Sequence, residues 1–98
     1  MKPKANTLTI SGNVDFSVGD IDHNGPVIIE GDVLPDFTIK ATDTIAISGN
    51  VQKAKIISKK DIHAHAVIEG KLESKGNIFI SYAKNSTIFS YNDIIVEN

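Results

Sequence analysis

The segment Ile45-Ala46-Ile47-Ser48-Gly49-Asn50-Val51 contains the pattern that decides the fold. Its first three residues form a unit in which two apolar residues stand on either side of a variable middle residue. A polar residue, a glycine, an asparagine and a valine follow this unit. Residues 8–14 and 27–33 repeat this order with small changes, and the three-residue apolar unit returns at residues 62–64, 78–80 and 94–96. Successive units begin 19, 18, 17, 16 and 16 residues apart. Self-similarity at a nearly constant period is the sequence signature of a repeat protein.

A second apolar position recurs at a constant distance from the three-residue unit. It lies six residues before each later unit and is occupied by Ile21, Ile39, Ile56, Leu72 and Ile88. Short strands cannot bury an apolar face within one coil, whereas stacked coils bury it against each other. We therefore predict an all-β fold, a single-stranded parallel β-helix (a solenoid) of about five coils with 16–19 residues per coil, and we expect it to be right-handed. The predicted domain spans residues 8–98 and follows an N-terminal tail at residues 1–7.

Other architectures fit the pattern less well. A β-sandwich also has short strands, but its hairpins do not require the same residue at the same phase of every turn. A β-helix built from hexapeptide repeats has a period that does not match coils of 16–19 residues. An α-helical fold is disfavoured because no window shows a sustained apolar stripe at helical spacing.

Composition restricts the class of protein. The chain has 98 residues, a formal net charge of −2 and an apolar share of 41%, which suit one small domain. Isoleucine (16 residues) and valine (7) outnumber leucine (3), as expected of strands. The lack of cysteine excludes disulfides and thiolate metal sites, and the lack of arginine removes the side chain best suited to phosphate. Because no apolar run could span a membrane and no secretion signal is evident, we expect a cytoplasmic protein without membrane insertion.

The alternation of side chains along the first strand of each coil divides them between core and surface. The first and third residues of every unit, Ile94 and Val96 included, should face the core. The middle residues should form an outer ladder that is apolar at four of six positions, and we predict that this ladder docks on a protein partner or on a second copy. The alternative is that branched side chains stand there only because they favour strands. The ladder begins at Thr9, and its predicted partner-binding residues are Ile28, Ala46, His63, Phe79 and Ile95.

The two histidines of one strand are the only candidates for a metal site. His63 and His65 should project from the same face, about 6.5–7 Å apart. A third ligand is required, and neither Asp61 nor Glu69 stands at a diagnostic spacing. We therefore interpret the pair as two surface histidines and expect no metal and no cofactor.

Lysines form a basic corner in the third and fourth coils. No aromatic residues alternate with them and the whole chain is slightly acidic, so we expect lysines that keep the turns soluble and no binding of nucleic acid. The corner contains Lys55, Lys59, Lys60, Lys71 and Lys75.

Catalysis has little support in the sequence. Segments outside the expected strands are too short to roof a pocket, and no nucleophile elbow, phosphate loop or dinucleotide fingerprint occurs. Asp22, Lys40 and Glu73 should share a face, but alternating charges stabilise a ladder without any catalytic role. We expect no enzymatic activity and no small-molecule substrate.

Several segments of the chain resemble the flagellar assembly protein A family of bacteria, which has a central β-helix. The most specific segment is Gly12-Asn13-Val14-Asp15-Phe16-Ser17-Val18-Gly19-Asp20-Ile21-Asp22. Residues 31–33, 37–41, 45–51, 85–88 and 93–96 extend the resemblance over about residues 10–98. The chain departs from the family at residues 42–44, 59–60 and 91–92, where paired glycines are replaced, and at residues 66–71, where a glycine-rich insertion is reduced.

The resemblance implies a cytoplasmic bacterial protein linked to flagellar assembly or placement that acts by interaction. Family members are typically longer, so this chain would be a β-helical portion of a longer protein or a small relative. The architecture is also similar to bactofilins and to the C-terminal domain of the division inhibitor MinC, which self-associate. The leading hypothesis is a non-catalytic interaction scaffold that docks through the outer ladder. The alternative is a bactofilin-like element whose terminal coils, at Leu8–Ile10 and Ile94–Val96, stack end to end into a polymer. A carbohydrate-binding β-helix is a third possibility and would use Phe79, Tyr82, Phe89 and Tyr91.

Overall fold

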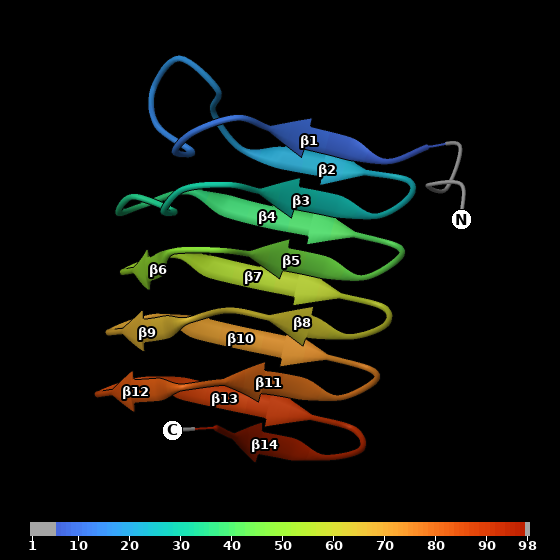
Figure 1. Ribbon diagram of the computed structural model, residues 1–98, viewed down its shortest axis with the longest axis vertical. Helices are drawn as coiled ribbons and strands as arrows, with labels where there is room; N and C mark the ends of the chain where they lie inside the picture. Colours follow the sequence, from blue (N-terminus) through green and yellow to red (C-terminus); the bar gives the residue numbers. More distant parts are fainter. Residues whose placement is uncertain (1–5, 98) are drawn as a thin grey trace.

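The computed structural model describes residues 6–97, which form fourteen short strands and no helix. The strands are two to four residues long, and the chain turns a corner after each one. Figure 1 shows the coils stacked one below the other, with each strand lying beneath its counterpart in the coil above. The all-β parallel solenoid expected from the sequence is confirmed.

Two long parallel sheets form most of the wall of the solenoid. Sheet 1 contains the first strand of every coil, in the order β1 (Leu8–Ile10), β3 (Val27–Ile29), β5 (Ile45–Ile47), β8 (Ile62–His63), β11 (Ile78–Ile80) and β14 (Ile94–Val96). Sheet 2 contains β2 (Ile21–His23), β4 (Thr38–Ala41), β7 (Lys55–Ser58), β10 (Lys71–Ser74) and β13 (Thr87–Ser90). These two sheets therefore make five complete coils and the first strand of a sixth, in agreement with the prediction of about five.

The register of the sheets follows the sequence repeat. In sheet 1 the first residue of each apolar unit pairs with the first residue of the next, as Val27 does with Ile45. In sheet 2 the second apolar series forms one column, Ile21, Ile39, Ile56, Leu72 and Ile88. Like residues therefore stack on like residues, which explains why isoleucine dominates the composition.

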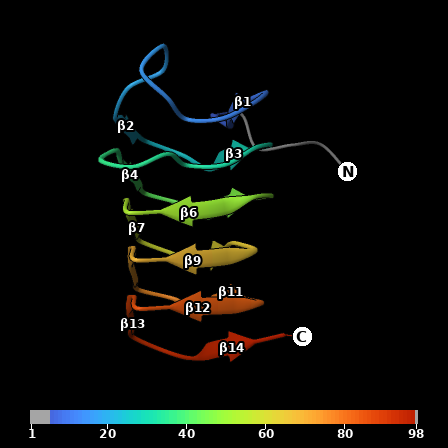
Figure 2. The ribbon, with the colours of Figure 1, turned by 90° about the vertical axis from the view of Figure 1, so that its left-hand side faces the viewer.

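A third, shorter sheet closes the wall, and the sequence analysis did not anticipate it. Sheet 3 contains β6 (Asn50–Gln52), β9 (Ala66–Ile68) and β12 (Tyr82–Lys84), and Figure 2 views the solenoid from this side. Two isolated bridges, Val14 to Val33 and Val33 to Val51, extend it toward the first coil. Each coil is thus three-sided, and the valine that ends each repeat unit belongs to this third side.

The core is a narrow apolar column between the three sheets. Branched residues from every sheet are fully buried there, among them Ile45, Ile56 and Val67. The inward positions of β3, β5, β8 and β11 are all buried, as predicted. Ile94 and Val96 stack beneath Ile78 and Ile80 in the predicted column but are 46% and 57% exposed, and Leu8 and Ile10 of β1 are half-buried. Among the described strands β1 pairs with β3 alone and β14 with β11 alone, so the core-facing residues of these two strands are covered by a strand on one side only.

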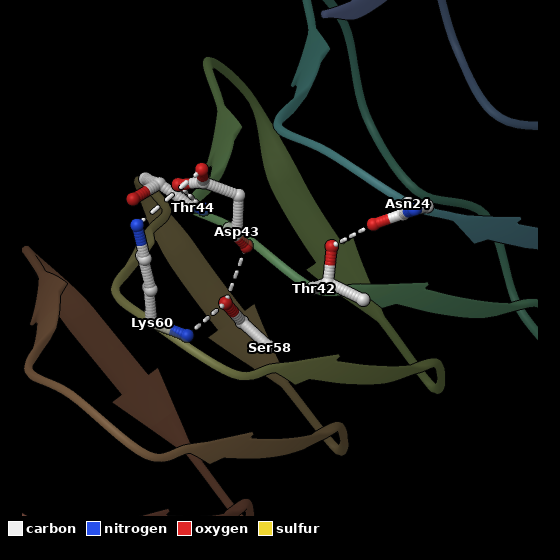
Figure 3. A network of polar contacts seen from close by, with 6 residues as sticks. All are labelled: Asn24, Thr42, Asp43, Thr44, Ser58 and Lys60. Carbon is white, nitrogen blue, oxygen red and sulfur yellow. Dashed lines mark hydrogen bonds and ion pairs between the residues drawn. The ribbon is translucent and has the colours of Figure 1, made fainter. Parts of the chain in front are cut away.

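Serine hydroxyls bridge neighbouring coils at the corner between sheets 2 and 1. Figure 3 shows Ser58, whose hydroxyl donates to the carbonyl of Asp43 at 2.7 Å and accepts from the backbone N–H of Lys60 at 3.0 Å. The same two bonds recur one and two coils further, at Ser74 and Ser90. Ser58 and Ser74 are buried, so each hydroxyl replaces the water that its backbone partners lose on folding.

Candidate interaction surface

The outer ladder predicted from the sequence exists as one straight column on sheet 1. The strand register places Thr9 beside Ile28, Ile28 beside Ala46, and so on through every coil. We call this column the outer stripe, and it consists of Thr9, Ile28, Ala46, His63, Phe79 and Ile95. Parallel pairing at a strand spacing of about 4.8 Å brings these side chains into contact along the stack.

The exposure of the outer stripe is uneven. Ile28 is 38% exposed and His63 is exposed, whereas Ala46, Phe79 and Ile95 are half-buried. The rings of His63 and Phe79 stack with their centroids 4.5 Å apart and their planes 12° from parallel. The stack makes a flat, mostly apolar platform in the middle of the stripe.

Polar residues border the outer stripe on one side. Two positions further along each strand stand a serine, glutamate or histidine, and most of these are exposed. They are Ser11, Glu30, Ser48, His65, Ser81 and Glu97. An apolar strip with a polar border has the composition expected of a small protein interface.

The two histidines lie where the alternation of the strand places them. Both His63 and His65 are exposed, with the buried Ala64 between them. Within residues 6–97 no three side chains of the metal-binding types His, Cys, Asp and Glu gather closely enough to hold a metal ion. The ring of His63 lies against Phe79, so its contact on that side is apolar.

Sheet 2 carries a mixed outward column. Asp22, Lys40 and Phe89 are exposed, and Ile57 and Glu73 between them are half-buried. Charged residues of both signs and apolar residues therefore share this column, and no single sign of charge prevails on this face.

The corner between sheets 3 and 2 carries a shallow groove. Four turn residues with positive φ line the groove, and the groove contains side chains of both signs of charge. Lys53, Lys55 and Lys71 line the groove together with Asp36 and Glu69. The basic corner expected from the sequence is not one surface, because Lys55 and Lys71 begin β7 and β10, whereas Lys59, Lys60 and Lys75 follow the ends of these strands at the next corner.

A protruding loop follows the first strand. Val18 and Gly19 donate backbone hydrogen bonds to the carbonyl of Asp15, at 3.0 and 2.8 Å, and close a tight turn. The hydroxyl and the backbone N–H of Ser17 donate to the Asp15 carboxylate, and these bonds lower the pKa of that carboxyl below its ordinary value. Phe16 is 97% exposed in this loop, and its edge contacts the ring of Phe37.

A second group of exposed apolar residues lies in the coils nearest to β14, and the sequence analysis named its members in two separate hypotheses, the end-to-end stacking of Ile94–Val96 and the aromatic residues of a carbohydrate-binding face. Exposed apolar residues gather in β14 and in the last complete coil: Tyr82, Phe89, Tyr91, Ile94 and Val96. Phe89 and Tyr91 stack with their ring centroids 5.1 Å apart. Ile94 and Val96 have the same spacing as residues that are buried in the middle coils, so the repeat predicts their direction but not their exposure.

A comparison with protein-family models agrees with the β-solenoid fold. Within the described residues the structure has no helix of a length and apolar character that could cross a membrane. Neither a search of curated proteins nor a search of solved structures returned a match. The family model of the Flagellar Assembly Protein A β-solenoid domain matches residues 6–98, which is nearly the whole chain. The chain therefore belongs to the Flagellar Assembly Protein A β-solenoid domain family.

Proposed function

We propose that this chain is a non-catalytic scaffold of flagellar assembly or placement that acts in the cytoplasm and docks on a protein partner through the outer stripe. The family membership supports the link to flagellar assembly. The observation that favours this docking surface is the straight column on sheet 1, in which the stacked rings of His63 and Phe79 are flanked by Ala46 and Ile95.

The physical argument rests on the rigidity of the surface. Every outer stripe residue stands on a strand that is hydrogen-bonded to its neighbours, so the platform loses little conformational entropy when a partner binds. Burial of a branched or aromatic side chain stabilises a complex by about 25 cal/mol per Å² of apolar area, so a flat row of such residues favours association. The polar border would then fix the position of the partner.

Introducing charge into the outer stripe tests the proposal. Ile28→Lys with Phe79→Lys would place two ammonium groups in the docking surface, while the outward direction of both side chains leaves the core intact. We expect the source bacterium carrying this double variant to show fewer or misplaced flagella by electron microscopy. Circular dichroism melting of the purified chain should confirm that the variant folds.

A matched variant on the opposite side of the solenoid controls for charge. Ile57→Lys with Phe89→Lys introduces the same two charges on the outward column of sheet 2. Flagellation should be normal in this strain. Normal flagellation with the outer stripe variant would overturn the proposed docking surface, and normal flagellation after deletion of the whole chain would overturn the link to flagella.

Light scattering distinguishes a foreign partner from self-association through the same surface. A wild-type solution mass that falls in the Ile28→Lys/Phe79→Lys variant would show that the outer stripe binds a second copy. An unchanged mass, together with the flagellar defect, would support a foreign protein partner.

A further inference from the structure

The groove at the corner between sheets 3 and 2 contains two lysines in directly opposite positions. Lys55 begins β7 and Lys71 begins β10, and the parallel register pairs these two residues. Both are exposed, and both line the groove. Neighbouring strands lie about 4.8 Å apart, so two positive charges leave the sheet side by side. Like charges in opposite positions destabilise a sheet.

No carboxylate of the described residues neutralises this lysine pair. Within residues 6–97 neither of its ammonium groups forms an ion pair. The other two charged residues that pair directly in sheet 2, Asp22 and Lys40, have opposite charges. Among the described strands of this sheet, the register thus brings like charges together only at the lysine pair. Such a departure from a stabilising rule is expected where a function requires it.

The opposite wall of the groove does not supply enough negative charge to cancel the pair. It is formed by the column of turn residues, in which Lys53 lies between Asp36 and Glu69. One lysine and two carboxylates give this turn wall a net charge of −1, whereas the lysine pair gives the strand wall a net charge of +2. The groove as a whole therefore keeps one positive charge, and the excess lies on the strand wall.

Two hydroxyls complete the strand wall. Thr38 pairs with Lys55 and Thr87 pairs with Lys71, so a threonine stands at each end of the lysine pair. The hollow has a volume of about 360 Å³, which is enough for a small molecule. Ammonium groups bind phosphate oxygens as point charges, and hydroxyl groups donate hydrogen bonds to them. The strand wall thus combines positive charge and hydrogen-bond donors in one row.

We propose that this groove binds the phosphate group of a small phosphate monoester or of free phosphate, between the ammonium groups of Lys55 and Lys71. A phosphate group carries nearly two negative charges at neutral pH, so it offsets both lysines, and its oxygens accept hydrogen bonds from both. The groove spans the middle coils at the corner opposite sheet 1, so this binding does not depend on docking through the outer stripe.

An NMR titration of the backbone amides tests the proposal. Inorganic phosphate replaces chloride at constant ionic strength, so that general screening of charge is unchanged. We expect saturable shifts at the amides of Lys55 and Lys71, and none at the amides of the outer stripe. A parallel titration with methyl phosphate distinguishes the two sources of the group. Saturation by both compounds would identify phosphate esters as ligands, and saturation by inorganic phosphate alone would identify the free anion.

Charge variants of the groove should change the affinity in opposite directions. Lys71→Gln removes one ammonium group and should raise the phosphate dissociation constant by about tenfold. Glu69→Gln removes a repelling carboxylate from the turn wall and should lower this constant by about threefold at low ionic strength. Lys75→Gln is the matched control, because Lys75 is exposed in the same coil but lies at the next corner, after β10. Its dissociation constant should equal that of the wild type.

Thermal unfolding in chloride checks that the variants fold and tests the repulsion independently. Lys71→Gln should unfold at or above the wild-type temperature, because it removes the like-charge pair. A clearly lower temperature would contradict the repulsion on which the site rests. Three further results would overturn the proposal: no saturable shift with either phosphate compound, saturable shifts only outside the groove, or equal dissociation constants for the Lys71→Gln and Lys75→Gln variants.

Discussion

The carboxylate of Asp32 lies over the Cα of Gly49 in the next coil. Its Oδ1 accepts a hydrogen bond from the backbone N–H of Asn50 at 2.7 Å, and a Cβ at position 49 would overlap this oxygen and lie 2.7 Å from the carbonyl oxygen of Gly31. The same arrangement occurs one coil earlier, where Asn13 bonds to the N–H of Asp32 at 2.8 Å. Glycine in the repeat thus permits a side-chain bridge between coils.

Gly49→Ala tests this close approach. The added methyl group must displace Asp32 or separate the coils, and overpacking of this kind destabilises a protein by about 1–3 kcal/mol. We expect the urea unfolding midpoint to fall accordingly. Gly12→Ala is the matched control, because a Cβ at Gly12 has no atom within 4 Å, and its midpoint should hardly change. Equal midpoints for the two variants would contradict the argument.

The buried hydroxyl of Ser74 should contribute to stability through its hydrogen bonds, one of which reaches the carbonyl of Asn77 at 3.3 Å. It donates to the carbonyl of Lys60 and accepts from the N–H of Gly76 at 3.0 Å. The N–H of Gly76 and the carbonyl of Lys60 keep their bond to each other at 3.0 Å in Ser74→Ala, so the expected loss is that of the hydroxyl's own hydrogen bonds, about 0.5–1.5 kcal/mol. Chemical denaturation measures the loss. Ser48→Ala, at an exposed position, should change the free energy of unfolding by less than about 0.5 kcal/mol, and a comparable loss there would refute the role of the Ser74 bridge.

The turn at Lys53 requires a left-handed backbone. Its φ is 46°, and the equivalent turns at Asp36, Glu69 and Asn85 have φ of 74°, 53° and 50°. A β-branched residue is poorly tolerated in this region, so Lys53→Val should destabilise the chain by about 1–2 kcal/mol. Lys53→Gly should not destabilise it by more than about 1 kcal/mol, because glycine enters this region freely.

The control for the turn is Lys55→Val, at the exposed start of β7. Valine favours strands, so thermal unfolding of this variant should occur at or above the wild-type temperature. A similar loss of stability for both valine variants would show that the lysine side chain, and not the backbone angle at position 53, is responsible.

The pKa of Asp15 should depend on Ser17. The Ser17 hydroxyl and N–H bonds lower the pKa of the carboxyl, so Ser17→Ala should raise it toward its ordinary value of 3.8. A group with a lowered folded-state pKa stabilises the fold above its unfolded pKa, and this contribution is lost as the pH falls through the folded pKa. The expected window is therefore below about pH 4. Titration of the Asp15 carboxyl by NMR in both chains checks the shift, and an unchanged pKa would exclude Ser17 as its cause.

The repeat made most of sheets 1 and 2 predictable. The columns through Ile45 and Ile56 could be aligned from spacing alone, because a parallel register needs equivalent residues at equivalent phases. Sheet 3 was not predicted because its later strands lack a local signal. In β9 the Gly-Asn pair is replaced by His65-Ala66, and in β12 the inward valine is replaced by Ala83. These strands form because they pair with neighbouring coils, β9 with both β6 and β12, and β12 with β9.

The outer stripe was predictable as a column, and its exposure was not. Alternation along a strand decides which side chains point outward, so Ile28 and Phe79 could be assigned to one face. How far each is covered depends on its neighbours in adjacent coils, such as the ring of His63 against Phe79. The same reasoning applies to Lys53, whose residue type does not favour a positive φ and whose turn conformation is imposed by the stack.

The amino-acid sequence by itself determined the repeat, the strand register and the division between inward and outward positions, since these depend on spacing along one chain. The tertiary structure alone decided that each coil has three sides and how deeply each member of a column is buried. Ile94 and Ile78 are identical residues at the same phase of the repeat, yet one is 46% exposed and the other is fully buried. Burial depends on which segments lie against a residue in three dimensions, which is a property of the assembled stack.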